Sequence, residues 1–191
     1  MVNLKTNKRL KTLIEKAKSG IDALYTTEIS KFEEHTLEKK GDSFAYSISF
    51  EGGSEHLKYN VIINAIGAIG KIKEHIRDIE QNGDVETFIN KSKELSLIMD
   101  LWNIDKHGYP LKQPRTQHYP IIDSIRSGLS GYREGGIIKY GNDEDNLATA
   151  KNMAIKISFN IVDKNTGKVL SDGDALLKSA LEQIQDYIST K

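Results

Sequence analysis

The apolar residues between Leu57 and Ile79 recur every three or four positions, and this spacing constrains the fold more than any other feature of the sequence. It is typical of an amphipathic helix that buries one face. Similar stripes run through about residues 7–39 and through residues 84–107. Gly67 and Gly70 lie within the middle stripe, where small residues allow a neighbouring backbone to approach closely. We therefore predict three long packed helices, with residues 55–81 as the central one.

The ends of these helices carry capping signals. Ser54 is placed as an N-cap, whereas Gly108 followed by Pro110 would end the third helix. A closing helix is expected to begin at Asp172 or Asp174. The inner faces of the helices should be mostly buried, and this set comprises Leu57, Ile69, Ile72, Ile76, Leu95, Met99 and Leu181.

Period-two alternation marks the candidate strands. Residues 153–162 alternate between apolar and polar, and Asp163–Gly167 is a turn signal before Lys168–Leu170, so we predict a β-hairpin. Phe44–Phe50 also alternates, which favours a short strand that could join the same sheet, with a helical continuation as the alternative. The predicted fold class is mainly α (α+β): a helical bundle with a small antiparallel β-hairpin or sheet near the C-terminus.

The length of 191 residues suits a single domain, 1–191. We divide it into a helical bundle at about 7–107, an irregular segment at 108–136, and a β-hairpin plus closing helix at 137–191. The irregular segment holds all three prolines and a candidate short helix over 121–129. A further short strand is predicted at 137–140.

Composition excludes several classes of protein. The 27 Lys and Arg residues balance the 27 Asp and Glu residues, so no global charge drives binding to nucleic acid or to an acidic membrane. Cysteine is absent, which excludes disulfides, thiolate metal sites and cysteine catalysis. The five histidines lack metal-ligand spacing, so we expect neither a metal nor a cofactor. No signal peptide or membrane span is evident, and we expect a cytoplasmic protein without a membrane partner.

One short motif points to chemistry, at the predicted end of the third helix. Asn103 and His107 are four residues apart and share a helix face, with Lys106 beside them and Tyr109 just beyond. A histidine can act as general acid or base, and a lysine can stabilise phosphate charge. The structural alternative is that Asn103 and His107 cap the last helical carbonyl groups.

This stretch resembles the signature of the HEPN superfamily, in which an Arg, a polar residue, a His and then a Tyr close a bundle helix. Asn103, His107 and Tyr109 match that signature, but Trp102 stands at the Arg position. In ribonuclease members of the superfamily, the Arg and the His pair across a dimer to cleave RNA. Since Trp supplies no guanidinium, the resemblance implies a catalytically inactive member or one that uses another cation. Lys106, Lys112 and Arg115 are the nearest candidates.

The leading expectation is a HEPN-like, non-catalytic module of a bacterial defence or toxin–antitoxin system that contacts RNA, a nucleotide or a protein. Lys112 and Arg115 would attract phosphate, and a homodimer or another protein is a candidate partner. One alternative is a metal-independent ribonuclease that uses His107. The other is a purely structural interaction protein in which His107 is a helix cap.

Overall fold

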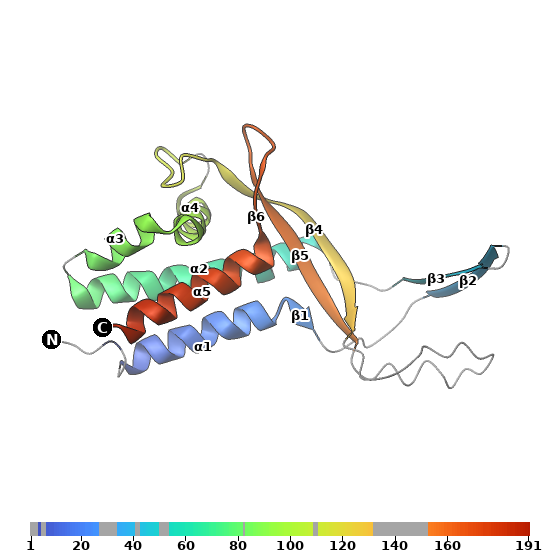
Figure 1. Cartoon of the computed structure of the whole chain (residues 1–191), viewed down its shortest axis with the longest axis horizontal. Coiled ribbons are helices and arrows are strands. Elements are labelled where there is room, and N and C mark those ends of the chain that lie inside the picture. Colours follow the sequence, from blue (N-terminus) through green and yellow to red (C-terminus); the bar gives the residue numbers. More distant parts are fainter. Residues whose placement is uncertain are drawn as a thin grey trace.

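The computed structural model describes Leu4 and residues 7–26, 34–40, 43–49, 54–81, 83–108, 111–131 and 153–191. Within these residues the chain forms five helices and six strands (Figure 1). The helices are α1 (Lys8–Asp22), α2 (Glu55–Glu80), α3 (Asp84–Lys91), α4 (Lys93–His107) and α5 (Gly173–Ser189). The strands are β1 (Tyr25–Thr26), β2 (Glu34–Lys40), β3 (Ser43–Ser49), β4 (Pro120–Gly131), β5 (Met153–Asp163) and β6 (Val169–Asp172). The predicted fold class, a mainly helical bundle with a small antiparallel sheet near the C-terminus, is confirmed.

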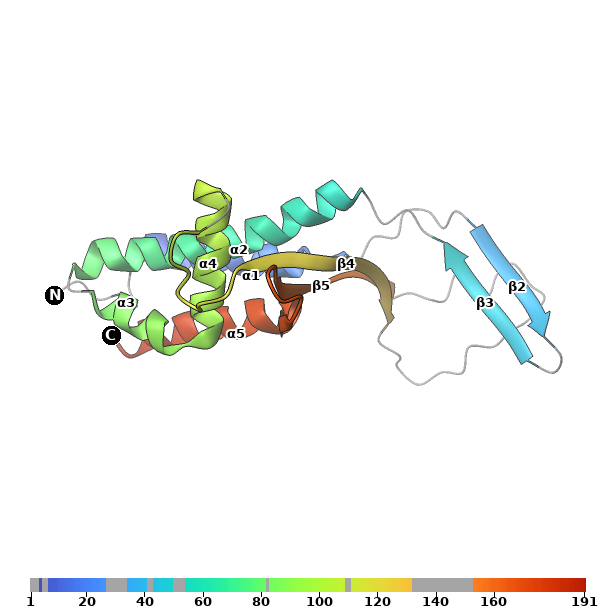
Figure 2. The ribbon, with the colours of Figure 1, turned by 90° about the horizontal axis from the view of Figure 1, so that it is seen from above.

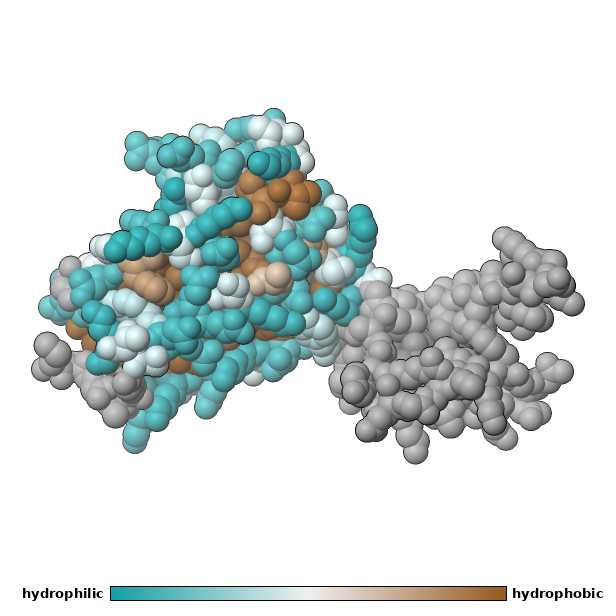
Figure 3. Space-filling view, in the orientation of Figure 1, coloured by the Kyte–Doolittle hydropathy of each residue, from teal (hydrophilic) through white to brown (hydrophobic). Residues whose placement is uncertain are grey.

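The helices α1, α2 and α5 lie side by side, and α4 crosses α2 at a steep angle (Figure 1, Figure 2). The apolar stripe of α2 faces this bundle, with Ile69, Ile72 and Ile76 all fully buried. Leu95, Met99 and Leu181 are buried as predicted. The burial predicted for Leu57 is wrong, because its first-turn position lies where residues 54–57 are all exposed and Leu57 itself is 57% exposed. Figure 3 shows that the outer face of the helices is mainly hydrophilic.

The predicted first helix, residues 7–39, is too long. α1 ends at Asp22, and residues 34–40 form β2, which pairs antiparallel with β3 from Glu34↔Ser49 to Lys40↔Ser43. The strand predicted at Phe44–Phe50 is thus confirmed with bounds Ser43–Ser49, and its helical alternative is wrong. Its partner is the neighbouring β2 in a separate two-stranded ladder, not the C-terminal sheet. Only two residues, Gly41 and Asp42, separate the two strands in the sequence, and such a short connection favours a β-hairpin. This local pairing forms where the sequence predicted the last part of the first helix.

The predicted helix over residues 84–107 is broken into two. Ser92 has extended backbone angles (φ −102°, ψ 126°), and its Oγ accepts a hydrogen bond of 3.1 Å from the N–H of Leu95. It therefore caps α4 and directs that helix across α2. Serine competes with helical hydrogen bonding in this way, so its N-cap role outweighs the continuing apolar period.

The C-terminal sheet is built around β5. β4 pairs along one side of it, from Pro120↔Asp163 to Gly131↔Met153, while β1 and β6 pair on the other. The predicted hairpin is confirmed, and Gly167 in its turn has a φ of +70°. The sheet meets the helices through contacts of β5 with α5 and of β4 with α4. Asp172 caps α5 through a 2.9 Å hydrogen bond from the N–H of Ala175.

Part of the segment predicted to be irregular, residues 108–136, forms the strand β4. The short helix predicted over 121–129 is wrong, since these residues hydrogen-bond to β5 as a strand with a register shift between Asp123 and Arg126. Apolar residues such as Ile121, Ile122 and Ile125 fit a helical spacing, but pairing with a distant strand decides their conformation. The strand predicted at 137–140 lies outside the described residues. No helix in the described part of the chain has both the length and the apolar character needed to cross a bilayer.

Candidate functional site

The residues of the predicted motif lie in the last two turns of α4. His107 is the final helical residue and is exposed, and Asn103 lies one turn earlier and is half-buried. Gly108 ends the helix with a φ of +82°, and its N–H donates to the Ile104 carbonyl at 2.8 Å. The predicted helix end is therefore confirmed, and His107 reaches solvent beside it. Tyr109, the fourth residue of the motif, lies outside the described residues.

Trp102 is seated against two glycines of α2. A Cβ on Gly70 would lie 2.5 Å from Trp102 Cδ1, and a Cβ on Gly67 would lie 2.8 Å from Trp102 Cζ3. Only glycine leaves room for the indole at these two positions. The sequence predicted that a neighbouring backbone would approach Gly67 and Gly70, but the group that lies against them is the Trp102 side chain of α4. Trp102 therefore acts as a packing residue between α2 and α4.

Lys106 is paired with a carboxylate of α2. Its Nζ lies 2.6 Å from Glu74 Oε1 and 5.3 Å from the centre of the Trp102 ring. Burial alone would raise the pKa of Glu74, but the hydrogen bond and charge of Lys106 bring this pKa below its usual value. Lys106 therefore carries a charge that Glu74 already balances.

Arg115 is directed to α3. Its Nη2 lies 2.9 Å from Glu86 Oε2, and its Nη1 donates to Asn90 Oδ1. Glu86 also forms an ion pair with Lys73, which is only 7% exposed. Arg115, which we predicted as a phosphate ligand near His107, thus belongs to an ion-pair network that joins α2, α3 and the loop after α4.

Asp100 anchors the same loop to α4. This carboxylate is 1% exposed and accepts hydrogen bonds from the Arg115 N–H at 2.8 Å, the Thr116 N–H at 3.0 Å and the Thr116 hydroxyl at 2.7 Å. It lies seven residues before His107, or roughly 10 Å along the helix axis. Sequence reasoning missed Asp100, although an acidic residue between the apolar Met99 and Leu101 is a signal for a buried polar anchor.

His118, two residues after Thr116, contacts the buried carboxylate of Asp163. His118 Nδ1 lies 2.8 Å from Asp163 Oδ2, and Asp163 Oδ1 accepts a 2.9 Å hydrogen bond from the Asn165 N–H. The hydrogen bond from the Asn165 N–H lowers the pKa of Asp163 most, and the hydrogen bond with His118 lowers it further. The pair joins the start of β4 to the end of β5. No local motif reveals it, because 45 residues separate the two side chains.

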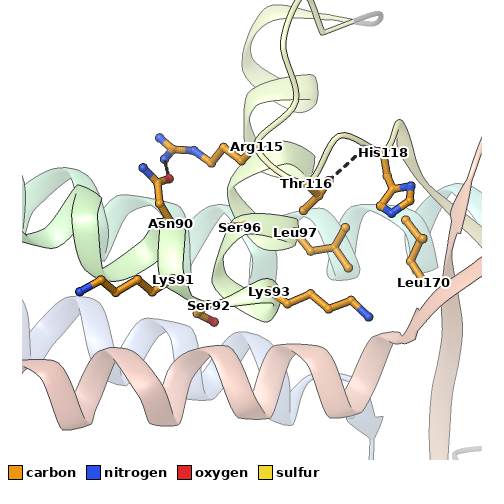
Figure 4. A pocket seen from close by; sticks show the side chains of 10 residues that line it. All are labelled: Asn90, Lys91, Ser92, Lys93, Ser96, Leu97, Arg115, Thr116, His118 and Leu170. Atoms are coloured by element: carbon orange, nitrogen blue, oxygen red, sulfur yellow. Dashed lines mark hydrogen bonds between the residues drawn. The ribbon is translucent and has the colours of Figure 1, made fainter.

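Arg115, Thr116 and His118 border an open groove of about 380 Å³ at the N-terminal end of α4 (Figure 4). The groove has basic, hydroxyl and apolar side chains but no acidic residue among its lining. The lining residues are Asn90, Lys91, Ser92, Lys93, Ser96, Leu97, Arg115, Thr116, His118 and Leu170. Neither Lys91 nor Lys93 forms an ion pair with another described residue.

The Glu86 network predicts an acid-dependent loss of stability. Burial raises the pKa of Glu86, but hydrogen bonds and charges from Lys73 and Arg115 outweigh it and leave the pKa below the ordinary 4.5. A carboxylate with a lowered pKa in the folded state stabilises the protein above its unfolded pKa, and this stabilisation is lost as the pH falls through the lowered value. We expect Glu86→Gln to unfold more easily at pH 7 and to lose less stability than the native chain on acidification below pH 4.5.

Urea denaturation between pH 7 and pH 3 measures this difference. Glu15→Gln, which changes an exposed glutamate of α1, is the matched control and should follow the native pH profile. Parallel profiles for the native chain and Glu86→Gln would contradict the role assigned to Glu86.

Within the described residues, no three His, Asp or Glu side chains gather closely enough to hold a metal ion together. The chain matches no known protein-family profile, no curated protein and no solved structure. Its function is therefore inferred from the site itself.

Proposed function

We propose that this chain is a HEPN-like, non-catalytic module that binds RNA through the surface at the C-terminal end of α4. The observation that carries the proposal is the seating of Trp102 between Gly67 and Gly70, at the position where ribonucleases of the superfamily hold an Arg. A half-buried indole cannot stabilise a phosphate in the way that a guanidinium does. His107 is left as an exposed binding group without that catalytic partner.

The neighbouring cations support the same conclusion. Lys106 is balanced by Glu74, and Arg115 is balanced by Glu86. Either one would have to leave its carboxylate in order to replace the missing Arg. Lys112 is exposed five residues after His107 and can attract phosphate together with it. The proposed setting is a cytoplasmic bacterial defence or toxin–antitoxin system, in which the module acts as a homodimer or with a protein partner.

A second candidate function, a protein-interaction module, is favoured by the first turns of α2. Leu57 and Tyr59 are 57% and 42% exposed there. Exposed large apolar side chains can contribute to a protein contact surface. In this case His107 would only cap α4, and RNA would not bind.

RNA cleavage without added metal, followed by RNA binding at two salt concentrations, tests the proposal. We expect no cleavage by the native chain, together with binding that weakens in His107→Ala and Lys112→Ala and falls steeply with salt. Because both side chains are exposed, the thermal stability of the variants should match that of the native chain. Lys16→Ala, which removes an exposed charge from α1, is the matched control and should bind RNA normally.

The other outcomes select the alternatives. Cleavage that disappears in His107→Ala would show that the chain is a ribonuclease. Absence of both cleavage and RNA binding, with a large loss of thermal stability in His107→Ala, would identify a structural cap.

A further inference from the structure

The helices α1 and α2 lie side by side and run antiparallel (Figure 1, Figure 2). At one end of their contact, a Cβ on Gly20 would lie only 3.2 Å from the Cα of Ala65. At the other end, the charge of Arg9 in the first turn of α1 acts on His75 of α2. His75 therefore lies beside the N-terminal end of α1.

The imidazole of His75 carries a polar atom without a partner. His75 is half-buried, and its Nε2 is shielded from solvent and has no hydrogen-bond partner among the described residues. Such atoms are rare in folded proteins, because each gives up its hydrogen bonds to water. His75 takes no part in the RNA surface proposed above.

The N-terminal end of α1 is crowded with positive charge. Lys8, Arg9 and Lys11 lie there, and the first turn of the helix has no acidic residue. None of these three cations forms an ion pair with another described residue. Cations are unfavourable at a helix N-terminus, which itself carries a partial positive charge. Apolar packing of Leu4 and Leu10, which are 2% and 1% exposed, therefore holds this end on the bundle.

We propose that protonation of His75 releases the N-terminal half of α1, residues 8–15, from α2. Both ring nitrogens of an imidazolium are donors, so the shielded Nε2 becomes part of a charged group that lacks an acceptor. The imidazolium also adds a fourth positive charge beside Lys8, Arg9 and Lys11. Release lets water solvate the ring and separates these charges.

The charges around His75 set the direction of the effect. Burial and then the charge of Arg9 lower the pKa of His75 below its ordinary 6.5, and the carboxylate of Asp78 on α2 opposes this shift only in part. Release of α1 removes both the burial and the Arg9 charge. The released form thus binds a proton more readily than the docked form, so docking is strongest above pH 6.5 and weakens as the pH falls below this value.

Hydrogen–deuterium exchange at pH 7.5 and pH 5.5, corrected for the intrinsic rate of each amide, tests the proposal. The amides of residues 12–15 lie beyond the first four of α1 and are hydrogen-bonded within the helix. We expect their opening equilibrium to rise at least about threefold at pH 5.5. The amides of α5 report on opening elsewhere in the bundle and should change less.

Three variants assign the effect to His75. His75→Gln keeps a polar side chain that takes up no proton in this pH range, so it should abolish the rise. Arg9→Gln should reduce the rise, because one fewer charge repels the imidazolium, and it should fold normally because Arg9 is exposed. His56→Gln makes the same change at an exposed histidine of α2, and this matched control should keep the native rise.

The proposal is overturned if residues 12–15 open equally at the two pH values, or if His75→Gln keeps the full rise. It is also overturned if α5 opens as much as α1, because acid would then loosen the whole bundle, or if His56→Gln abolishes the rise. Should His75→Gln fail to fold, an undiminished rise in Arg9→Gln overturns the proposal. None of these outcomes depends on RNA binding at the His107 surface.

Discussion

Truncating Ile72 to alanine is expected to lower the free energy of unfolding by about 2–5 kcal/mol. Ile72 is fully buried in α2, the helix that contacts α1, α3, α4 and α5. The substitution removes three carbons from a packed interior, so it loses their transfer free energy and leaves a cavity that its neighbours fill only partly. Urea denaturation followed by far-ultraviolet circular dichroism measures the change.

Leu57→Ala is the control for this experiment, because it lies in the same helix and is 57% exposed. We expect its unfolding free energy to stay within about 0.5 kcal/mol of the native value. Similar losses for Ile72→Ala and Leu57→Ala would contradict the packing described for α2.

Gly70→Ala is expected to destabilise the protein by about 1–3 kcal/mol through overpacking. In an open helix position the same change would be favourable by up to about 1 kcal/mol, because alanine is the better helix former. Here the new Cβ would lie 2.5 Å from Cδ1 and 2.6 Å from Cγ of Trp102. Cγ is close to the backbone of α4, so the indole cannot avoid the clash unless α4 itself shifts.

The chain has one tryptophan, and its fluorescence therefore reports on this contact directly. We expect a shifted emission maximum in Gly70→Ala together with the lower unfolding free energy. Gly70→Ala should cost less in a Trp102→Ala background, which lacks both atoms, than in the native chain, and the double-mutant cycle should give a coupling energy above about 0.5 kcal/mol. A neutral or stabilising Gly70→Ala would show that the indole does not occupy this position.

The packing of Trp102 also bears on function. Trp102 holds α4 against α2, so Trp102→Arg would lose that contact and cost stability. The end of α4 thus combines a structural tryptophan with an exposed histidine. The groove at the other end of the helix is built differently, from ion pairs and hydrogen bonds that span three elements.

The helices α2 and α5 and the hairpin of β5 and β6 could be predicted from the sequence alone. Their signals are local: an apolar period of 3.6 in α2, alternation in β5, a turn at Asp163–Gly167, and capping side chains at Ser54 and Asp172. The end of α4 at Gly108 was predictable for the same reason. Each of these features depends on residues within a few positions of one another.

Tertiary structure decided the rest, because the stabilising contacts join residues far apart in the chain. Ile121, Ile122 and Ile125 suit either a helix or a strand, and pairing with β5 selects the strand. Leu57 shares the apolar period of α2, yet only the arrangement of the other helices leaves it exposed.

The candidate sites show the same division. The sequence placed Asn103, Lys106 and His107 at a helix end, since spacing along one helix is a local property. It could not show that Glu74 neutralises Lys106 or that Glu86 holds Arg115 away from the motif, because 32 and 29 residues separate these partners. Ion pairs between residues so far apart in the sequence form only where packing brings the helices together. The tertiary structure therefore decides which of these charged side chains are neutralised by a partner.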